Sequence, residues 1–280
     1  MRFTKMQAAG NDYVYMSALR HPISHPEELA VRISDRHFGV GSDGLILICP
    51  PSDPAVADFR MRMFNADGSE SEMCGNGIRC VGKYVYDNGH TDKEEVRIET
   101  LAGIRVLKLH VVQGKVETVT VDMGEPHLKP AEIPVSDSGE RFVDRPLRVH
   151  GRIWNVTAVS MGNPHAVVFT RDIDRLDLPD LGPHFEHHAL FPRRTNTEFV
   201  EVVDRDTLKM RVWERGAGET LACGTGACAT VAAAVLTGRT GRNVRVRLLG
   251  GDLDIEWDEA TNHIFMTGGA VVVFTGDYPE

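Results

Sequence analysis

The chain has 280 residues, on the order of two domains of average size, and 42% of them are hydrophobic, which is enough for ordinary cores. Charged residues make up 25%, so disorder is not indicated, and the net charge of −9 argues against nucleic acid or an anionic membrane surface as a partner. The segment Leu221–Leu236 carries no charge. It is shorter than the roughly 20 apolar residues of a membrane span, so we expect a buried helix there.

The first half of the chain is predicted to be rich in strands. Phe59, Met61 and Met63 alternate with arginines, which is typical of a strand with one buried face. The predicted strands are Asp58–Asn65, Val96–Leu101, Ile104–Val112 and Val116–Met123, with a hairpin turn at Gln113–Gly114. The predicted helices are Glu27–Ser34, with Ser24 as a cap, and Gly75–Tyr86, which ends at Asn88–Gly89.

The second half repeats this organisation. Its predicted strands are Thr197–Val203, Leu208–Trp213, Val244–Leu249, Leu253–Trp257 and His263–Met266. One helix follows Cys223 directly, runs to about Leu236 and ends at Gly238. The stretch Glu125–Asp144 is rich in proline, serine and charge, and we expect the halves to join there.

Short segments of the two halves match in the same order and at nearly constant spacing. The pairs are Gly10–Val14 with Gly162–Ala166, Met73–Gly77 with Ala222–Gly226, and Val96–Gly103 with Val244–Gly251. Asn65 and Glu214 each precede their cysteine by nine positions. We therefore predict an α+β fold of two similar domains formed by internal duplication, each a curved, mostly antiparallel sheet or barrel around a central helix, with the active site in the cleft between them. The expected domains are residues 1–124 with 268–280, and residues 125–267.

Each of the two matching cysteines, Cys74 and Cys223, stands just before a glycine-rich helix start. The first N–H groups of a helix have no internal partner, so this end attracts a carboxylate and is expected to lower the pKa of a thiol. A pair of such thiols suggests a two-base reaction on a substrate carbon. Cys49, Cys80 and Cys228 are expected to be buried apolar residues.

Other kinds of site are not supported by the sequence. Gly75-x-Gly77 and Gly224-x-Gly226 are incomplete as dinucleotide-binding motifs. The Cys-x5-Cys and Cys-x4-Cys spacings do not suit zinc, and no lysine lies in a recognisable pyridoxal phosphate motif. We therefore expect neither a cofactor nor a metal. A redox thiol protein is a weaker reading, because no resolving cysteine is close in sequence.

At these residues the chain resembles the diaminopimelate epimerases, a family of cofactor-independent isomerases. The resemblance covers nearly the whole chain. Proline racemases and hydroxyproline epimerases of the wider superfamily typically carry a histidine where this chain has Asn76, and phenazine-type isomerases lack the cysteine pair. The resemblance to the diaminopimelate epimerases is carried by the motifs Gly10–Asp12, Phe64–Gly68, Met73–Cys80, Gly162–His165, Arg194–Asn196, Glu214–Gly216 and Ala222–Gly226.

The resemblance implies conversion of LL-2,6-diaminopimelate into meso-diaminopimelate, in lysine and peptidoglycan precursor biosynthesis, with Cys74 and Cys223 as acid and base. It implies thiol tuning by His165 and Glu214. Some family members have a glutamine where this chain has Gly44, so no side-chain contact is assigned at that position. The implied substrate-binding residues are Asn11, Asn65, Gly75, Asn76, Asn163, Asn196, Glu214, Arg215, Gly224 and Thr225.

Several alternatives stay open at this level. The asparagines could be turn residues, Glu214 and Arg215 a surface pair, and His165 a core histidine. The protein could also be a proline or hydroxyproline racemase, or a binding protein of the same superfamily that does not racemise. An odd number of cysteines, with no apolar leader in Met1–Gln7, favours the reducing cytoplasm. A homodimer is suggested by the resemblance alone.

Overall fold

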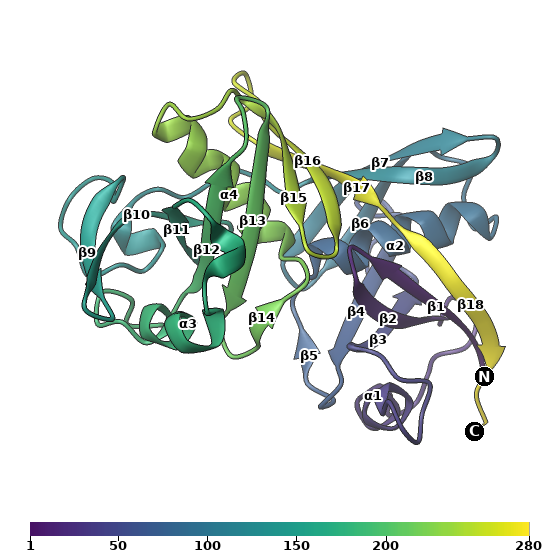
Figure 1. The fold of residues 1–280 in the computed structure, drawn as a ribbon. Coiled ribbons are helices and arrows are strands. Elements are labelled where there is room, and N and C mark those ends of the chain that lie inside the picture. Colours follow the sequence, from purple (N-terminus) through teal and green to yellow (C-terminus); the bar gives the residue numbers. More distant parts are fainter. Residues whose placement is uncertain (280) are drawn as a thin grey trace. The chain divides into compact units, whose positions relative to one another are not determined.

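The computed structural model describes residues 1–279, and these form two compact units (Figure 1). Unit 1 consists of Met1–Asp122 together with the C-terminal segment that begins at Thr267. Unit 2 consists of Met123–Met266. The chain thus leaves unit 1, builds the whole of unit 2 and returns to complete unit 1.

Unit 1 contains nine strands and two helices among the described residues. The strands are β1 (Arg2–Ala8), β2 (Asn11–Ser17), β3 (Gly44–Cys49), β4 (Phe59–Asn65), β5 (Glu70–Ser71), β6 (Glu95–Thr100), β7 (Gly103–Val112), β8 (Lys115–Asp122) and β18 (Val271–Asp277). The helices are α1 (Pro26–Ser34) and α2 (Gly75–Asp87). The last strand, yellow in Figure 1, pairs antiparallel with the first, in purple.

Unit 2 follows the same plan. Its strands are β9 (Arg145–Val149), β10 (Arg152–Ser160), β11 (Pro164–Phe169), β12 (Asn196–Val202), β13 (Thr207–Glu214), β14 (Gly218–Thr220), β15 (Asn243–Leu248), β16 (Gly251–Trp257) and β17 (Ile264–Gly269), whose end extends past the boundary. Its helices are α3 (Leu178–Glu186) and α4 (Gly224–Leu236), with 3-10 turns at Pro130–Glu132 and Ile173–Arg175.

The strand pairings of the two units correspond one to one. In unit 1, β1–β2 is antiparallel, β2–β3 parallel, β3–β4 and β4–β5 antiparallel, β4–β6 parallel and β6–β7 antiparallel. In unit 2, the same sequence of directions joins β10–β11, β11–β12, β12–β13, β13–β14, β13–β15 and β15–β16. The predicted α+β fold with two similar halves is confirmed.

One helix in each unit packs against several strands of that unit. The α2 helix contacts β1, β2, β7 and β8, and α4 contacts β10, β11, β12 and β16. Most α4 residues are buried, and small side chains dominate because strands surround the helix on several sides. The uncharged segment is therefore the central helix of a globular unit, as its composition predicts. No helix within residues 1–279 is long and apolar enough to cross a membrane.

Two local predictions can be compared with the structure. The hairpin turn is confirmed, since Gln113 and Gly114 both have positive φ, 51° and 77°. The expected Ser24 cap is wrong: α1 begins at Pro26, and its N-cap is His25, with a φ of 49°. Proline is favoured in the first helical turn and keeps the preceding residue out of the right-handed helical conformation, which moves the cap by one position.

Sequence patterns did not indicate some elements. The α3 helix contains Pro179 and Pro183, which interrupt a helical pattern and hid it. The strands β10 and β11 are buried on both faces over much of their length, so they lack the alternation that marks a half-buried strand. The proline-rich stretch from Glu125 belongs to unit 2.

Candidate active site

The thiol of unit 1 is the N-cap of α2. Cys74 has extended backbone, with a φ of −130°, and its Sγ accepts a hydrogen bond from the Gly77 N–H at 3.4 Å. The same thiol donates to Asn11 Oδ1 at 3.3 Å. Asn11 in turn donates from Nδ2 to Asp43 Oδ2 at 2.7 Å, which fixes the direction of its amide. Cys74 is half-buried.

Gly77 lets α2 approach the sheet closely. A Cβ at this position would lie 2.8 Å from Ile46 Cδ1, closer than van der Waals contact allows. The glycine-rich helix start therefore has a packing role besides the close ligand approach that the sequence suggested.

The remaining candidate residues of unit 1 lie before and after Cys74 in the sequence. Asn65 ends β4 and donates from Nδ2 to Ser69 Oγ at 3.0 Å. Gly75 and Asn76 form the first turn of α2, and the side chain of Asn76 is buried. The fully buried Arg79 donates to Gly75 O at 3.1 Å and to Asn76 Oδ1 at 3.0 Å. A buried guanidinium thus braces the helix start, which sequence analysis did not indicate.

The thiol of unit 2 is the N-cap of α4 and is more deeply buried, at 5% exposure. Its Sγ lies 3.5 Å from Thr225 Oγ1. It also hydrogen-bonds with the Glu214 carboxylate, which accepts from the Thr220 hydroxyl as well. The end of β13 and the short strand β14 bring these groups to the helix start.

Burial raises the pKa of the Cys223 thiol well above its usual range, and the negative charges of Glu214 and Glu198 raise it further. The Thr225 hydroxyl and the Gly226 N–H act in the opposite direction but do not outweigh the rise. The expectation that the helix start lowers the thiol pKa is therefore wrong for Cys223, because dehydration and two carboxylates dominate. Burial likewise raises the pKa of Glu214, against the hydrogen bonds from Thr220 and Cys223.

A chain of buried and half-buried polar contacts leads away from this thiol. Asn163 donates from Nδ2 to Thr225 Oγ1 at 3.2 Å, and its Oδ1 lies 2.9 Å from His165 Nε2. His165 Nδ1 lies 2.7 Å from Glu198 Oε1, and both side chains are fully buried. His165 is therefore a hydrogen-bonded core histidine, and the same contacts connect it to the Cys223 side of the unit.

Two further candidates of unit 2 contact each other. Asn196, which begins β12, accepts a hydrogen bond at Oδ1 from the Arg215 backbone N–H at 2.8 Å. The exposed Arg215 guanidinium donates to Arg193 O at 3.1 Å. Gly224 is the first residue of α4 and is buried. Glu214 lies against Cys223, so the reading of Glu214 and Arg215 as a plain surface pair does not describe this carboxylate.

Comparison with known proteins places this geometry in a family. The family described as diaminopimelate epimerase matches the chain over residues 3–129 and 157–273. The chain belongs to the diaminopimelate epimerase family. The diaminopimelate epimerase of Desulfovibrio desulfuricans is 62% identical over 99% of this chain and 98% of its own length. That of Acetivibrio thermocellus is 60% identical over the same shares of both chains. The resemblance found in the sequence motifs is confirmed.

Solved structures with low sequence identity share the fold. A Bacillus anthracis phenazine biosynthesis protein of the PhzF family matches with a TM-score of 0.70 at 17% identity, over 100% of this chain and 99% of that one. A hydroxyproline epimerase from Agrobacterium vitis matches with a TM-score of 0.66 at 14% identity, over 99% and 90%. The two-unit fold is therefore common to proteins whose names indicate different reactions.

Of the other three cysteines, two are buried as expected and Cys49 is only half-buried. Cys80 and Cys228 are fully buried, and Cys49 packs at the edge of the unit 1 core. Burial raises the pKa of Cys80 to about 11, with a partly opposing hydrogen bond from Tyr15. None of the five cysteines forms a disulfide within residues 1–279.

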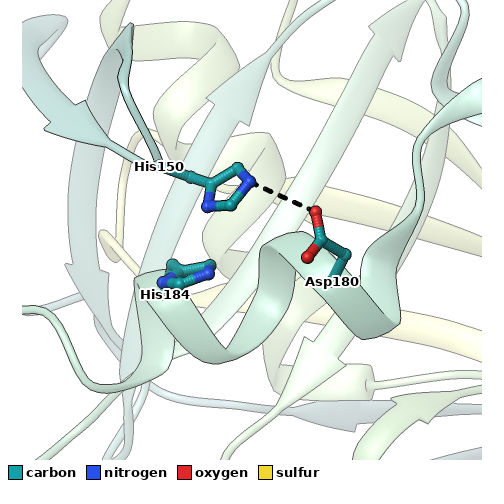
Figure 2. A group of neighbouring side chains, drawn as sticks. All are labelled: His150, Asp180 and His184. Carbon is teal, nitrogen blue, oxygen red and sulfur yellow. Dashed lines mark ion pairs between the residues drawn. The ribbon is translucent and has the colours of Figure 1, made fainter.

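One group of side chains in unit 2 could hold a metal ion (Figure 2). His150 Nε2 pairs with Asp180 Oδ2 at 3.3 Å, and the His150 and His184 rings stack with centroids 4.3 Å apart. Imidazole and carboxylate are donors for zinc and related ions. The sequence did not indicate the group, because His150 lies in the β9–β10 turn and the other two on α3. All three are exposed, and none is among the described contacts of Cys223, so the candidate active site does not include them.

Proposed function

We propose that the chain is a cofactor-independent epimerase that interconverts LL- and meso-2,6-diaminopimelate with Cys74 and Cys223 as the acid and base. The observation that carries this proposal is the placement of the two thiols at equivalent helix starts of two units with the same connectivity. Family membership supports the substrate. The proposed setting is lysine and peptidoglycan precursor biosynthesis.

The mechanism requires each thiol to reach one face of the same substrate carbon. One thiolate removes the α-proton, and the other thiol delivers a proton to the opposite face, which inverts the centre. The negative charge that develops in between is stabilised by N–H groups at the starts of α2 and α4, with Gly75, Asn76, Gly224 and Thr225 in their first turns. The raised pKa of Cys223 suits that thiol to the role of proton donor at the start of a turnover.

The remaining candidates are assigned to recognition of the substrate. Arg215 offers a planar fork that fits a carboxylate, and its exposed side chain is free to reorient. Asn11, Asn65, Asn163 and Asn196 offer amide groups for the amino and carboxyl groups, including those of the distal centre. Glu214 accepts hydrogen bonds, and together with His165 it sets the electrostatic surroundings of Cys223.

The test is proton exchange. Purified protein is incubated in deuterated water with LL-diaminopimelate and, in parallel, with lysine, proline and glutamate, and the α-carbon is followed by NMR and chiral chromatography. We expect deuterium at the inverted centre of diaminopimelate alone. Exchange with proline but not diaminopimelate would support the racemase alternative, and no exchange with any of them would leave a binding protein.

We further propose a cytoplasmic location and a homodimeric active form. Free thiols are needed by the mechanism, and a reducing compartment preserves them. Val271, Val272, Val273 and Phe274 of β18 are all exposed, at 42–54%, and such an apolar run is typical of an interaction surface. Sedimentation of the wild type and of Phe274→Glu tests this: we expect a dimer that the substitution dissociates, and a fully active wild-type monomer would contradict it.

A further inference from the structure

Glu198 lies close enough to Cys223 to act on its thiol, at a position where the equivalent residue of unit 1 is not a carboxylate. The registers of the two units show this. In unit 1, Tyr13 on β2 pairs with Gly44 on β3, and in unit 2 His165 on β11 pairs with Asn196 on β12. Two residues further along, Ile46 on β3 is therefore equivalent to Glu198 on β12. Both side chains are fully buried.

The helices provide an independent check of this equivalence. A Cβ at Gly77 would lie 2.8 Å from Ile46 Cδ1, and a Cβ at Gly226 would lie 2.6 Å from Glu198 Oε1. Each side chain therefore fills the space under the first turn of its central helix, three residues after the capping cysteine. An isoleucine fills this space in unit 1, so packing alone does not call for a carboxylate in unit 2.

The cost of burying Glu198 is high. Its exposure is zero, and within residues 1–279 its Oε2 has no hydrogen-bond partner, while Oε1 pairs with His165. A buried carboxylate with an unsatisfied oxygen destabilises a protein unless its partners compensate. A chain that keeps such a group where its own duplicate has isoleucine gains something other than stability.

We propose that Glu198 is a positioning residue for the proposed epimerisation: through His165 and Asn163 it fixes the Thr225 hydroxyl beside the Cys223 thiol. The contacts form a continuous line. They run from Glu198 Oε1 to His165 Nδ1 at 2.7 Å, from His165 Nε2 to Asn163 Oδ1 at 2.9 Å, from Asn163 Nδ2 to Thr225 Oγ1 at 3.2 Å, and from there to Cys223 Sγ at 3.5 Å.

The line has a definite polarity. Asn163 can donate from Nδ2 to Thr225 only if its Oδ1 faces His165, so His165 Nε2 must carry a hydrogen and donate it. Glu198 as a carboxylate can only accept a hydrogen bond, so its contact with Nδ1 requires a hydrogen on that nitrogen as well, and this second contact prevents the ring from turning. The negative charge of Glu198 also acts directly on Cys223, together with that of Glu214.

The test uses two substitutions, Glu198→Ile, which copies unit 1, and Glu198→Gln, which removes the charge but keeps an acceptor. The exposed Glu256→Gln on β16 is the matched control. Three quantities are measured: kcat and KM for diaminopimelate, the rate at which iodoacetamide alkylates Cys223 without substrate, followed by peptide mass spectrometry, and the melting temperature.

We expect Glu198→Ile to lower kcat on the order of 10²-fold with a smaller change in KM, since a misplaced group costs about that much. Glu198→Gln should lose less, both should speed alkylation of Cys223, and the control should change nothing. Wild-type kcat and alkylation rate in folded Glu198→Ile would overturn the proposal. A folded variant with a lower melting temperature but unchanged kcat and alkylation would likewise reduce Glu198 to a structural residue.

The inference rests on the proposed function only for the turnover measurement. If the protein does not epimerise diaminopimelate but the Glu198 variants change Cys223 alkylation, the proposed function fails and the positioning role stands. If the variants do not fold, ¹⁵N NMR of the wild-type His165 ring, assigned with His165→Asn, decides the matter. We expect a proton on Nε2, and a bare Nε2 would break the line to Thr225 and overturn the proposal.

Discussion

The two units surround their thiols with different groups although their strands pair in the same order. Cys74 in unit 1 is half-buried and donates to the Asn11 amide, which Asp43 holds. Cys223 in unit 2 is buried against Glu214 and the His165–Glu198 pair. Both units have a cysteine that caps a helix and a glycine three residues later. These shared features are the ones that the fold and the anion-binding end of a helix need. Where they differ, unit 1 has Asn65 and Ile46 at the positions at which unit 2 has the carboxylates Glu214 and Glu198. The negative charges of these two carboxylates raise the pKa of Cys223.

The largest expected effect tests whether both thiols are needed. We expect Cys74→Ala and Cys223→Ala each to lower kcat by on the order of 10⁴-fold, the upper end of what a positioned acid or base contributes. The controls are Cys80→Ala and Cys228→Ala, the fully buried cysteines of the same two helices. These should keep turnover and lose about 1 kcal/mol of unfolding free energy. Near-normal turnover in either of the first two variants would rule out a two-thiol mechanism.

The second effect concerns substrate recognition by unit 2. Arg215→Lys should lower kcat/KM for diaminopimelate by about 10- to 100-fold, because an ammonium does not reproduce two parallel hydrogen bonds to a carboxylate. Arg193→Lys, at the residue whose carbonyl the Arg215 side chain contacts, is the control. Steady-state kinetics decide, and equal values for the wild type and Arg215→Lys would remove Arg215 from the recognition site.

The third effect concerns the proton affinity of Cys223. Glu214→Gln removes a negative charge that raises the Cys223 pKa, so the thiolate becomes less unfavourable and the pH midpoint of Cys223 alkylation should move down. The other groups that act on this thiol, Glu198, the Thr225 hydroxyl and the Gly226 N–H, are unchanged. Alkylation is followed from pH 6 to 11 by peptide mass spectrometry, with Glu256→Gln as control. A midpoint that stays in place would show that Glu214 does not set the proton affinity of Cys223.

A smaller effect is expected on stability at high pH. The pKa of Cys80 is raised from 9.0 to about 11, so the folded state holds this proton more tightly than the unfolded state does. The resulting stabilisation is fully present below pH 9.0 and is lost as the pH rises through about 11. Urea unfolding across this range should therefore show a steeper loss for the wild type than for Cys80→Ala. Parallel curves would mean that Cys80 does not contribute to the pH dependence.

Chelation of metal ions is expected to have no effect on turnover. None of His150, Asp180 and His184 is among the described contacts of Cys223, so EDTA and the His184→Gln substitution are expected to leave turnover unchanged. Initial rates before and after dialysis against EDTA provide the measurement. Activity lost on chelation and restored by a divalent metal would show that a metal takes part.

The sequence predicted the features that depend on short-range pattern. The two cysteine motifs, the central helices and the duplication are visible because their residues are neighbours along the chain and recur in one order. The proximity of Glu198 to Cys223 cannot be predicted from the sequence. It depends on the register of β11 against β12 and on how closely the start of α4 approaches β12. The same holds for Arg79, which reads as a surface residue of an amphipathic helix but is fully buried.

The direction of the Cys223 pKa shift shows why electrostatics resist prediction from sequence. A helix start is recognised from a cap and glycines, and its dipole favours a thiolate. Whether water and carboxylates reach the same sulfur depends on residues from β12 and β13, which only the folded unit brings together.

The return of the chain to unit 1 has a consequence for protein synthesis. β1 pairs with β2 on one edge and with β18 on the other, and the Met1 ammonium donates to the Tyr278 carbonyl at 2.5 Å. On the ribosome, the residues of β18 emerge only after the whole of unit 2 has been made. Until then β1 keeps an open edge, the kind of surface on which nascent chains pair wrongly. The half of the molecule that is translated first is therefore completed last, and unit 2 is the part that can reach its full set of strand partners while translation continues.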